Sequence, residues 1–114
     1  MPEITQEEFQ IKHKVALGAE YNRALEVFRF CTPYSAWKFS NLMEKSQQYG
    51  LVDRVLDIME EGREAYLDSI DDEILKHSEI WRLIDVIYGD LFAPHLAAEL
   101  SQTSRLWVPP GTRR

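Results

Sequence analysis

Histidine is the residue type in this sequence with the widest chemical use, because it serves both as a metal ligand and as a general base. The three histidines, His13, His77 and His95, lie on three separate predicted helices, and none has a second histidine three or four residues away. His77 and His95 each stand four residues from a glutamate, which is equally typical of ordinary contacts on a helix surface. We therefore expect no metal site, no cofactor and no catalytic histidine.

Cys31 is the single cysteine, which excludes an internal disulfide and a zinc site built from two or more thiolates. It precedes a predicted helix start at Thr32-Pro33, where backbone N–H groups could lower the pKa of a thiol. It also follows Phe28 and Phe30, and free cysteines are commonly buried among such residues. We expect an unreactive Cys31. Phosphate-binding loops, dinucleotide glycine motifs and serine elbows are absent as well, so the sequence does not predict an enzyme.

Acidic residues are concentrated in the middle of the 114-residue chain, whose net charge is −6. The stretch from Asp53 to Asp90 contains twelve acids and four bases. Such a surface repels phosphate groups and is complementary to a basic protein. The candidate partner-binding residues in this stretch are Glu60, Glu61, Glu64, Asp68, Asp71 and Asp72. The alternative is a solvated face, in which the acids near residue 71 are favoured by a helix N-terminus.

A second candidate for partner binding lies near the end of the sequence. Trp107 stands between Leu106 and Val108, ahead of Pro109-Pro110, and Arg105 is close by. Tryptophan and arginine are the residues most enriched at binding hot spots. Two interpretations remain open: Trp107 packs on its own domain as a clasp, or Trp107 and Arg105 form a recognition element for a partner.

The elements that must position these residues are predicted to be helices. Thr5 and Glu8 form a capping box, and apolar residues at helical spacing then predict a first helix over residues 6–30 that includes Gly18. Thr32-Pro33 begins a second helix that ends at Gly50.

The acidic stretch is also predicted to be helical. From Leu51 one apolar face continues past Gly62, where the helix either breaks or admits a close neighbour; we favour a continuous or kinked helix. Ser69 is predicted to cap a further helix that Gly89 ends. A last short helix reaches Gln102, and the residues beyond it are predicted to be extended.

These elements predict an all-α protein with a single compact domain of four or five helices over residues 1–102 and an extended tail over 103–114. The expected aromatic anchors of its core are Phe9, Phe28, Trp37, Tyr66 and Trp81. No apolar run approaches the roughly 18 residues needed to span a bilayer, and no signal peptide pattern is present. We expect a cytoplasmic protein without a membrane partner.

Elimination leaves protein binding as the predicted function. The chain is expected to act on a larger, basic protein as a small inhibitor, immunity protein or assembly factor, and to form a homodimer in some cases. One alternative is an accessory subunit of a multi-subunit enzyme that docks through Trp107. Another is a helix-turn-helix regulator over residues 33–62, but acids on its second helix oppose entry into a DNA groove, so a nucleic-acid partner is not expected.

Overall fold

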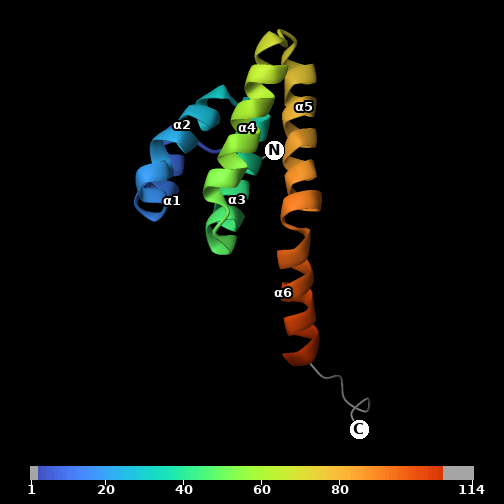
Figure 1. Cartoon of the computed structure of the whole chain (residues 1–114). Helices are drawn as coiled ribbons and strands as arrows, with labels where there is room; N and C mark the ends of the chain where they lie inside the picture. Colours follow the sequence, from blue (N-terminus) through green and yellow to red (C-terminus); the bar gives the residue numbers. More distant parts are fainter. Residues whose placement is uncertain (1–2, 107–114) are drawn as a thin grey trace.

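The computed structural model describes the backbone of residues 3–106 and the side chains of residues 3–101. Within these ranges the chain forms helices joined by short turns and contains no strand, which confirms the all-helical prediction (Figure 1). The third helix, α3 (Pro33–Tyr49), packs against α1, α2, α4 and α5. Among residues 3–106, no helix is long and apolar enough to cross a membrane.

The prediction of one helix over residues 6–30 is wrong, because the chain turns back at Gly18. Helix α1 (Gln6–Leu17) ends there, a 3₁₀ turn (Gly18–Glu20) follows, and α2 (Tyr21–Phe30) packs against α1. Gly18 has a φ of 57°, which residues with a side chain rarely adopt. The turn brings Phe9 and Phe28 into contact, with ring centroids 4.3 Å apart, so burial of both rings favours the break.

The predicted limits of α3 are confirmed. Thr32 and Ser35 cap each other's backbone N–H groups, and Pro33 occupies the first turn, where its missing N–H has no cost. Gly50 ends the helix with a φ of 71°.

Helix α4 (Val52–Ala65) passes through Gly62 without a break. A Cβ atom at Gly62 would lie 2.6 Å from Cδ2 of Leu83, so the glycine allows α4 and the helix that carries Leu83 to approach closely. After a 3₁₀ turn (Leu67–Ser69), α5 (Glu73–Val86) begins. Its N-cap is Asp72, whose carboxylate accepts from the Leu75 N–H, and not Ser69 as the sequence predicts.

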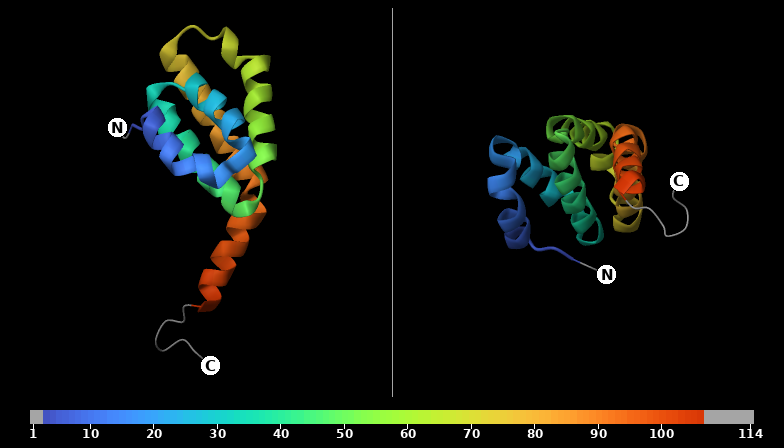
Figure 2. Two further views of the ribbon diagram at one scale, coloured as in Figure 1. Left: turned by 90° about the vertical axis from the view of Figure 1, so that its left-hand side faces the viewer. Right: turned by 90° about the horizontal axis from the view of Figure 1, so that it is seen from below.

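Gly89 does not end the helix that contains it. It lies in a π-helical turn (Ile87–Leu91), closed by a hydrogen bond from the Phe92 N–H to the Ile87 carbonyl, and α6 (Ala93–Leu106) follows directly. The π-helical turn buries both Ile87 and Phe92, and this burial is a physical reason for the wider turn to form at Gly89. Helix α6 continues the line of α5 beyond the body formed by α1–α5 (Figure 2). Residues 103–106, which the sequence assigns to the extended tail, are therefore helical, and residues 107–114 lie outside the described part of the chain.

One core joins the helices of the body. Phe9 and Phe28 belong to it as predicted, together with buried aliphatic residues from α2 to α5. Tyr66 does not: it is 37% exposed, because α4 ends just before it. Trp37 and Trp81 are only half-buried and pack edge-to-face, with centroids 5.7 Å apart, at the side of the body where α3 meets α5.

Candidate interaction surfaces

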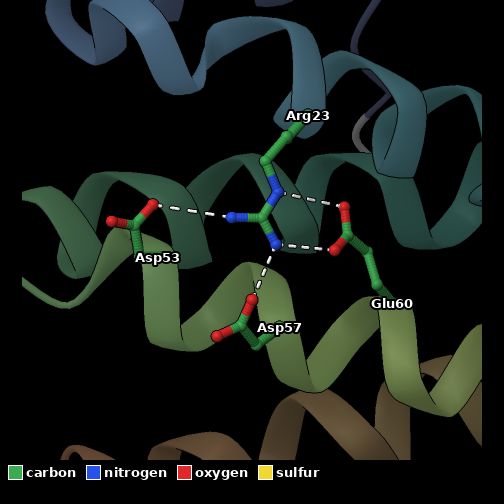
Figure 3. A network of polar contacts seen from close by, with 4 residues as sticks. All are labelled: Arg23, Asp53, Asp57 and Glu60. Atoms are coloured by element: carbon green, nitrogen blue, oxygen red, sulfur yellow. Dashed lines mark hydrogen bonds and ion pairs between the residues drawn. The ribbon is translucent and has the colours of Figure 1, made fainter.

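Arg23 of α2 holds three carboxylates of α4 (Figure 3). Its Nη2 atom lies 2.6 Å from Glu60 Oε1 and 2.8 Å from Asp57 Oδ1, and its Nε atom donates to the second oxygen of Glu60. Asp53 lies 3.5 Å from Nη1. The three acids follow one another at helical spacing and so share one face of α4. Hydrogen bonds to Glu60 and Asp57 raise the pKa of Arg23.

We expect Arg23→Met to lower the free energy of unfolding by about 1–2 kcal/mol, because three neighbouring carboxylates would lose the cation between them. The loss should shrink at high salt, which screens their repulsion. Urea denaturation at low and high salt measures this effect. Arg54→Met on the same helix is the control, and it should change stability by less than about 0.5 kcal/mol. Equal stability of the two variants would mean that the Arg23 cluster does not hold α2 against α4.

An acidic depression of about 570 Å³ lies next to this cluster, between α2 and α4. It is lined by Asn22, Arg23, Glu26, Val27, Glu60, Arg63, Glu64 and Asp68. Three of the predicted partner-binding residues, Glu60, Glu64 and Asp68, therefore lie on one surface, whereas Glu61 is exposed on α4 but does not line the depression. Asp68 pairs with Arg63 at 3.3 Å.

The other predicted acidic residues lie elsewhere. Asp71 is exposed, and Asp72 caps α5, so neither lines the depression. Arg105 belongs to the backbone of α6, but its side chain is outside the described residues, as is all of Trp107. Glu26 and Asn22 of α2 were not predicted, because nothing in the sequence shows that α2 faces α4.

A second surface, here called the α5 groove, runs along α5 beside the start of α3. Its apolar part has a volume of about 330 Å³ and is lined by Thr32, Pro33, Tyr34, Glu73, Ile74 and His77. A wider and more open part, of about 680 Å³, continues from His77 along α5 to Asp90. Ile74 is 79% exposed at the groove, although its residue type and helical register would suit a core position. The sequence does not predict this groove, because its walls are forty residues apart in the chain.

Aromatic side chains make up much of the α5 groove. The Trp81 indole donates to the backbone carbonyl of Tyr34, and Lys38 lies 3.7 Å from the centre of the Trp81 ring while pairing with Asp85 at 2.7 Å. Two buried polar atoms have no hydrogen-bond partner within the described residues: Nδ1 of His77, which lines the groove, and Nε1 of Trp37, which packs behind Trp81 and does not line it. Such atoms are uncommon in native proteins.

A catalytic role for His13 or Cys31 is not supported by their surroundings. His13 is buried in the core, where its Nε2 atom lies 2.8 Å from Ser40 Oγ, so no substrate reaches the pair. Burial raises the pKa of the Cys31 thiol to about 12, which keeps it protonated and unreactive. Among the described residues, no group of three or more His, Cys, Asp or Glu side chains is placed to hold a metal ion.

Glu99, in the middle of α6, fastens this helix to the end of α3. Its carboxylate accepts hydrogen bonds from Tyr49, Lys45 and Gln48, with the Tyr49 hydroxyl at 2.8 Å. Hydrogen bonds from Tyr49 and Lys45 lower the pKa of Glu99. His95 stacks on the Tyr49 ring, with centroids 4.7 Å apart. The His95/Glu99 pair therefore serves as a contact between helices.

No protein-family model matches the sequence, and no curated protein or solved structure is significantly similar to the chain.

Proposed function

We propose that this protein works without catalysis, by binding a larger protein whose contact surface is basic. The observation that carries this proposal is the acidic depression, which brings Glu60, Glu64 and Asp68 together with Glu26 from another helix. Complementary charge on two proteins speeds their encounter and excludes wrong partners. An inhibitor, an immunity protein or an assembly factor would act in this way.

The negative charges available to a partner are those that no lysine or arginine of this chain already pairs with. Arg23 already engages Glu60, Asp57 and Asp53, and Arg63 engages Asp68. Among the described residues, Glu26, Glu61 and Glu64 are exposed and have no ion pair. Glu26 and Glu64 line the depression, and Glu61 lies three residues before Glu64 on α4. These side chains are thus available to meet a lysine or arginine of the partner.

The same charges disfavour DNA as the ligand. In a helix-turn-helix arrangement α4 would enter the major groove, and its exposed acids, Asp57, Glu61 and Glu64, would face phosphates. Protein binding therefore has more support than regulation of transcription.

Capture from a lysate of the native host tests the proposal. The immobilised wild type should retain one dominant protein at low salt, and Glu61→Lys/Glu64→Lys should weaken that binding about tenfold, because attraction becomes repulsion at two positions. Glu60 should be left unchanged, since its reversal would also break the Arg23 cluster. The matched control is Glu3→Lys/Glu7→Lys, which changes the net charge equally on exposed residues outside the depression. Loss of binding in both variants, or in neither, would contradict the proposal.

A further inference from the structure

The apolar part of the α5 groove has the dimensions of a site for one large side chain. Its volume of about 330 Å³ lies at the lower end of the range found for ligand pockets, roughly 300–1,000 Å³. Tyr34 and Ile74 line it and are exposed, so they would lose solvent contact when a side chain entered. An aromatic side chain would bury more area here than any other type.

The groove also offers aromatic rings to a docked backbone. Tyr34 lines its apolar part and Trp81 lines its wider part. Grooves lined by aromatic rings bind proline-containing segments, which are extended without internal hydrogen bonds and lose little entropy when they dock.

The charge of the groove specifies the occupant further. Glu73 and Asp90 line it and have no ion pair among the described residues, Asp85 is already paired with Lys38, and the one base of the lining, Arg82, lies 3.6 Å from Glu79. A segment with an aromatic anchor, prolines and positive charge would be complementary. This chain carries one in residues 105–114, Arg-Leu-Trp-Val-Pro-Pro-Gly-Thr-Arg-Arg.

The end of α6 at Leu106 lies far from the groove of its own chain. Helix α6 runs on from α5 away from the body (Figure 2), and Leu106 lies 29 residues past His77 along this nearly continuous line of helix. At about 1.5 Å per residue the separation is roughly 40 Å. Trp107 follows Leu106 by one residue, which adds about 3.8 Å of reach. An occupant with this sequence must therefore come from another molecule.

We infer that residues 105–114 of one copy of this chain dock in the α5 groove of a second copy, with Trp107 in the apolar part. In a dimer with two-fold symmetry the α5–α6 lines of the two copies are antiparallel, so a segment that enters the apolar part continues past the start of the partner copy's α5. Asp71 and Glu73 are exposed there, and the arginines at positions 113 and 114 would meet these carboxylates. Mutual exchange of the two segments gives a closed dimer with two-fold symmetry.

Sedimentation equilibrium of the full chain tests this inference. The wild type should be a dimer, and Trp107→Ala should raise its dissociation constant at least about thirtyfold, as expected for a hot-spot residue. Ile74→Arg, which blocks the apolar part, should have the same effect. Ile11→Arg is the matched control, since Ile11 is 82% exposed on α1 and lies outside the groove; it should remain dimeric.

A mixture of the Trp107→Ala and Ile74→Arg variants gives a second test, because misfolded variants would not recover association when they are mixed. Trp107→Ala retains an intact groove and Ile74→Arg retains an intact segment, so the mixture should associate although neither variant does alone. A monomeric wild type would assign the groove to a different protein and overturn the inference. A mixture that stays monomeric would also overturn the inference, as would a Trp107→Ala variant that dimerises as tightly as the wild type. The Glu61→Lys/Glu64→Lys variant should dimerise normally, which separates this inference from the proposed function.

Discussion

Replacing Phe39 by alanine is expected to lower the free energy of unfolding by about 3–5 kcal/mol, the range observed for large-to-small changes at buried aromatic positions. Phe39 is completely buried on α3, the helix that contacts α1, α2, α4 and α5, and it stacks near Phe9 with centroids 6.0 Å apart. Domains of this size are stable by only about 5–15 kcal/mol. The variant should therefore melt at a much lower temperature than the wild type, as thermal denaturation followed by circular dichroism would measure.

Val15→Ala provides the comparison for Phe39→Ala. Val15 is an apolar residue on α1 with 93% of its surface exposed, so its truncation should change stability by less than about 0.5 kcal/mol. Equal melting temperatures for the two variants would contradict the position of α3 at the centre of the core.

The stability of the protein is expected to fall between neutral pH and about pH 4 in a manner that depends on His13. Burial, with a smaller contribution from the charge of Lys12, lowers the pKa of His13 from 6.5 to about 4. The unfolded chain therefore binds a proton below about pH 6.5 that the folded protein accepts only near pH 4. The stability lost from this group across that window is about 3 kcal/mol, and acidification below about pH 4 adds no further loss.

His13→Gln isolates this contribution from the carboxylates that titrate at similar pH. Glutamine does not titrate, and its amide can still bond to Ser40, the partner of His13. Urea denaturation at pH 7 and at about pH 4.5 should show that the variant loses about 2.5 kcal/mol less than the wild type. The same pH dependence in both proteins would show that His13 is accessible to protons in the folded state.

The sequence predicts the local features of this fold well, because each depends on neighbouring residues. The capping box of Thr5 and Glu8 forms as expected, Gly50 ends α3, and Gly62 allows a close neighbour. The predicted continuation of the first helix through Gly18 is wrong, because the apolar spacing continues across it and only the contact of Phe9 with Phe28, far apart in the sequence, favours a turn. The predicted helix end at Gly89 is wrong for a similar reason, since burial of Phe92 keeps the chain helical.

The candidate surfaces depend on contacts between distant residues, and the sequence predicts them only in part. An excess of acids on one helix indicates an acidic face, but it does not reveal that Arg23, 37 residues before Glu60, neutralises part of it. The sequence does offer a helix N-terminus as the alternative use of the acids near residue 71, but it places the cap at Ser69 and not at Asp72. The α5 groove has no local signal, because Tyr34 and Ile74 meet only when α3 packs against α5.

The most direct test of the central claim is the association rate of the purified protein with its captured partner, measured as a function of salt concentration. If the acidic depression binds a basic surface, the wild type and Glu3→Lys/Glu7→Lys should associate quickly and slow steeply as salt rises. Glu61→Lys/Glu64→Lys should associate slowly, with little dependence on salt. An association rate for Glu61→Lys/Glu64→Lys that equals the wild-type rate at every salt concentration would contradict the claim, and would leave the acidic face of α4 with a role in solubility alone.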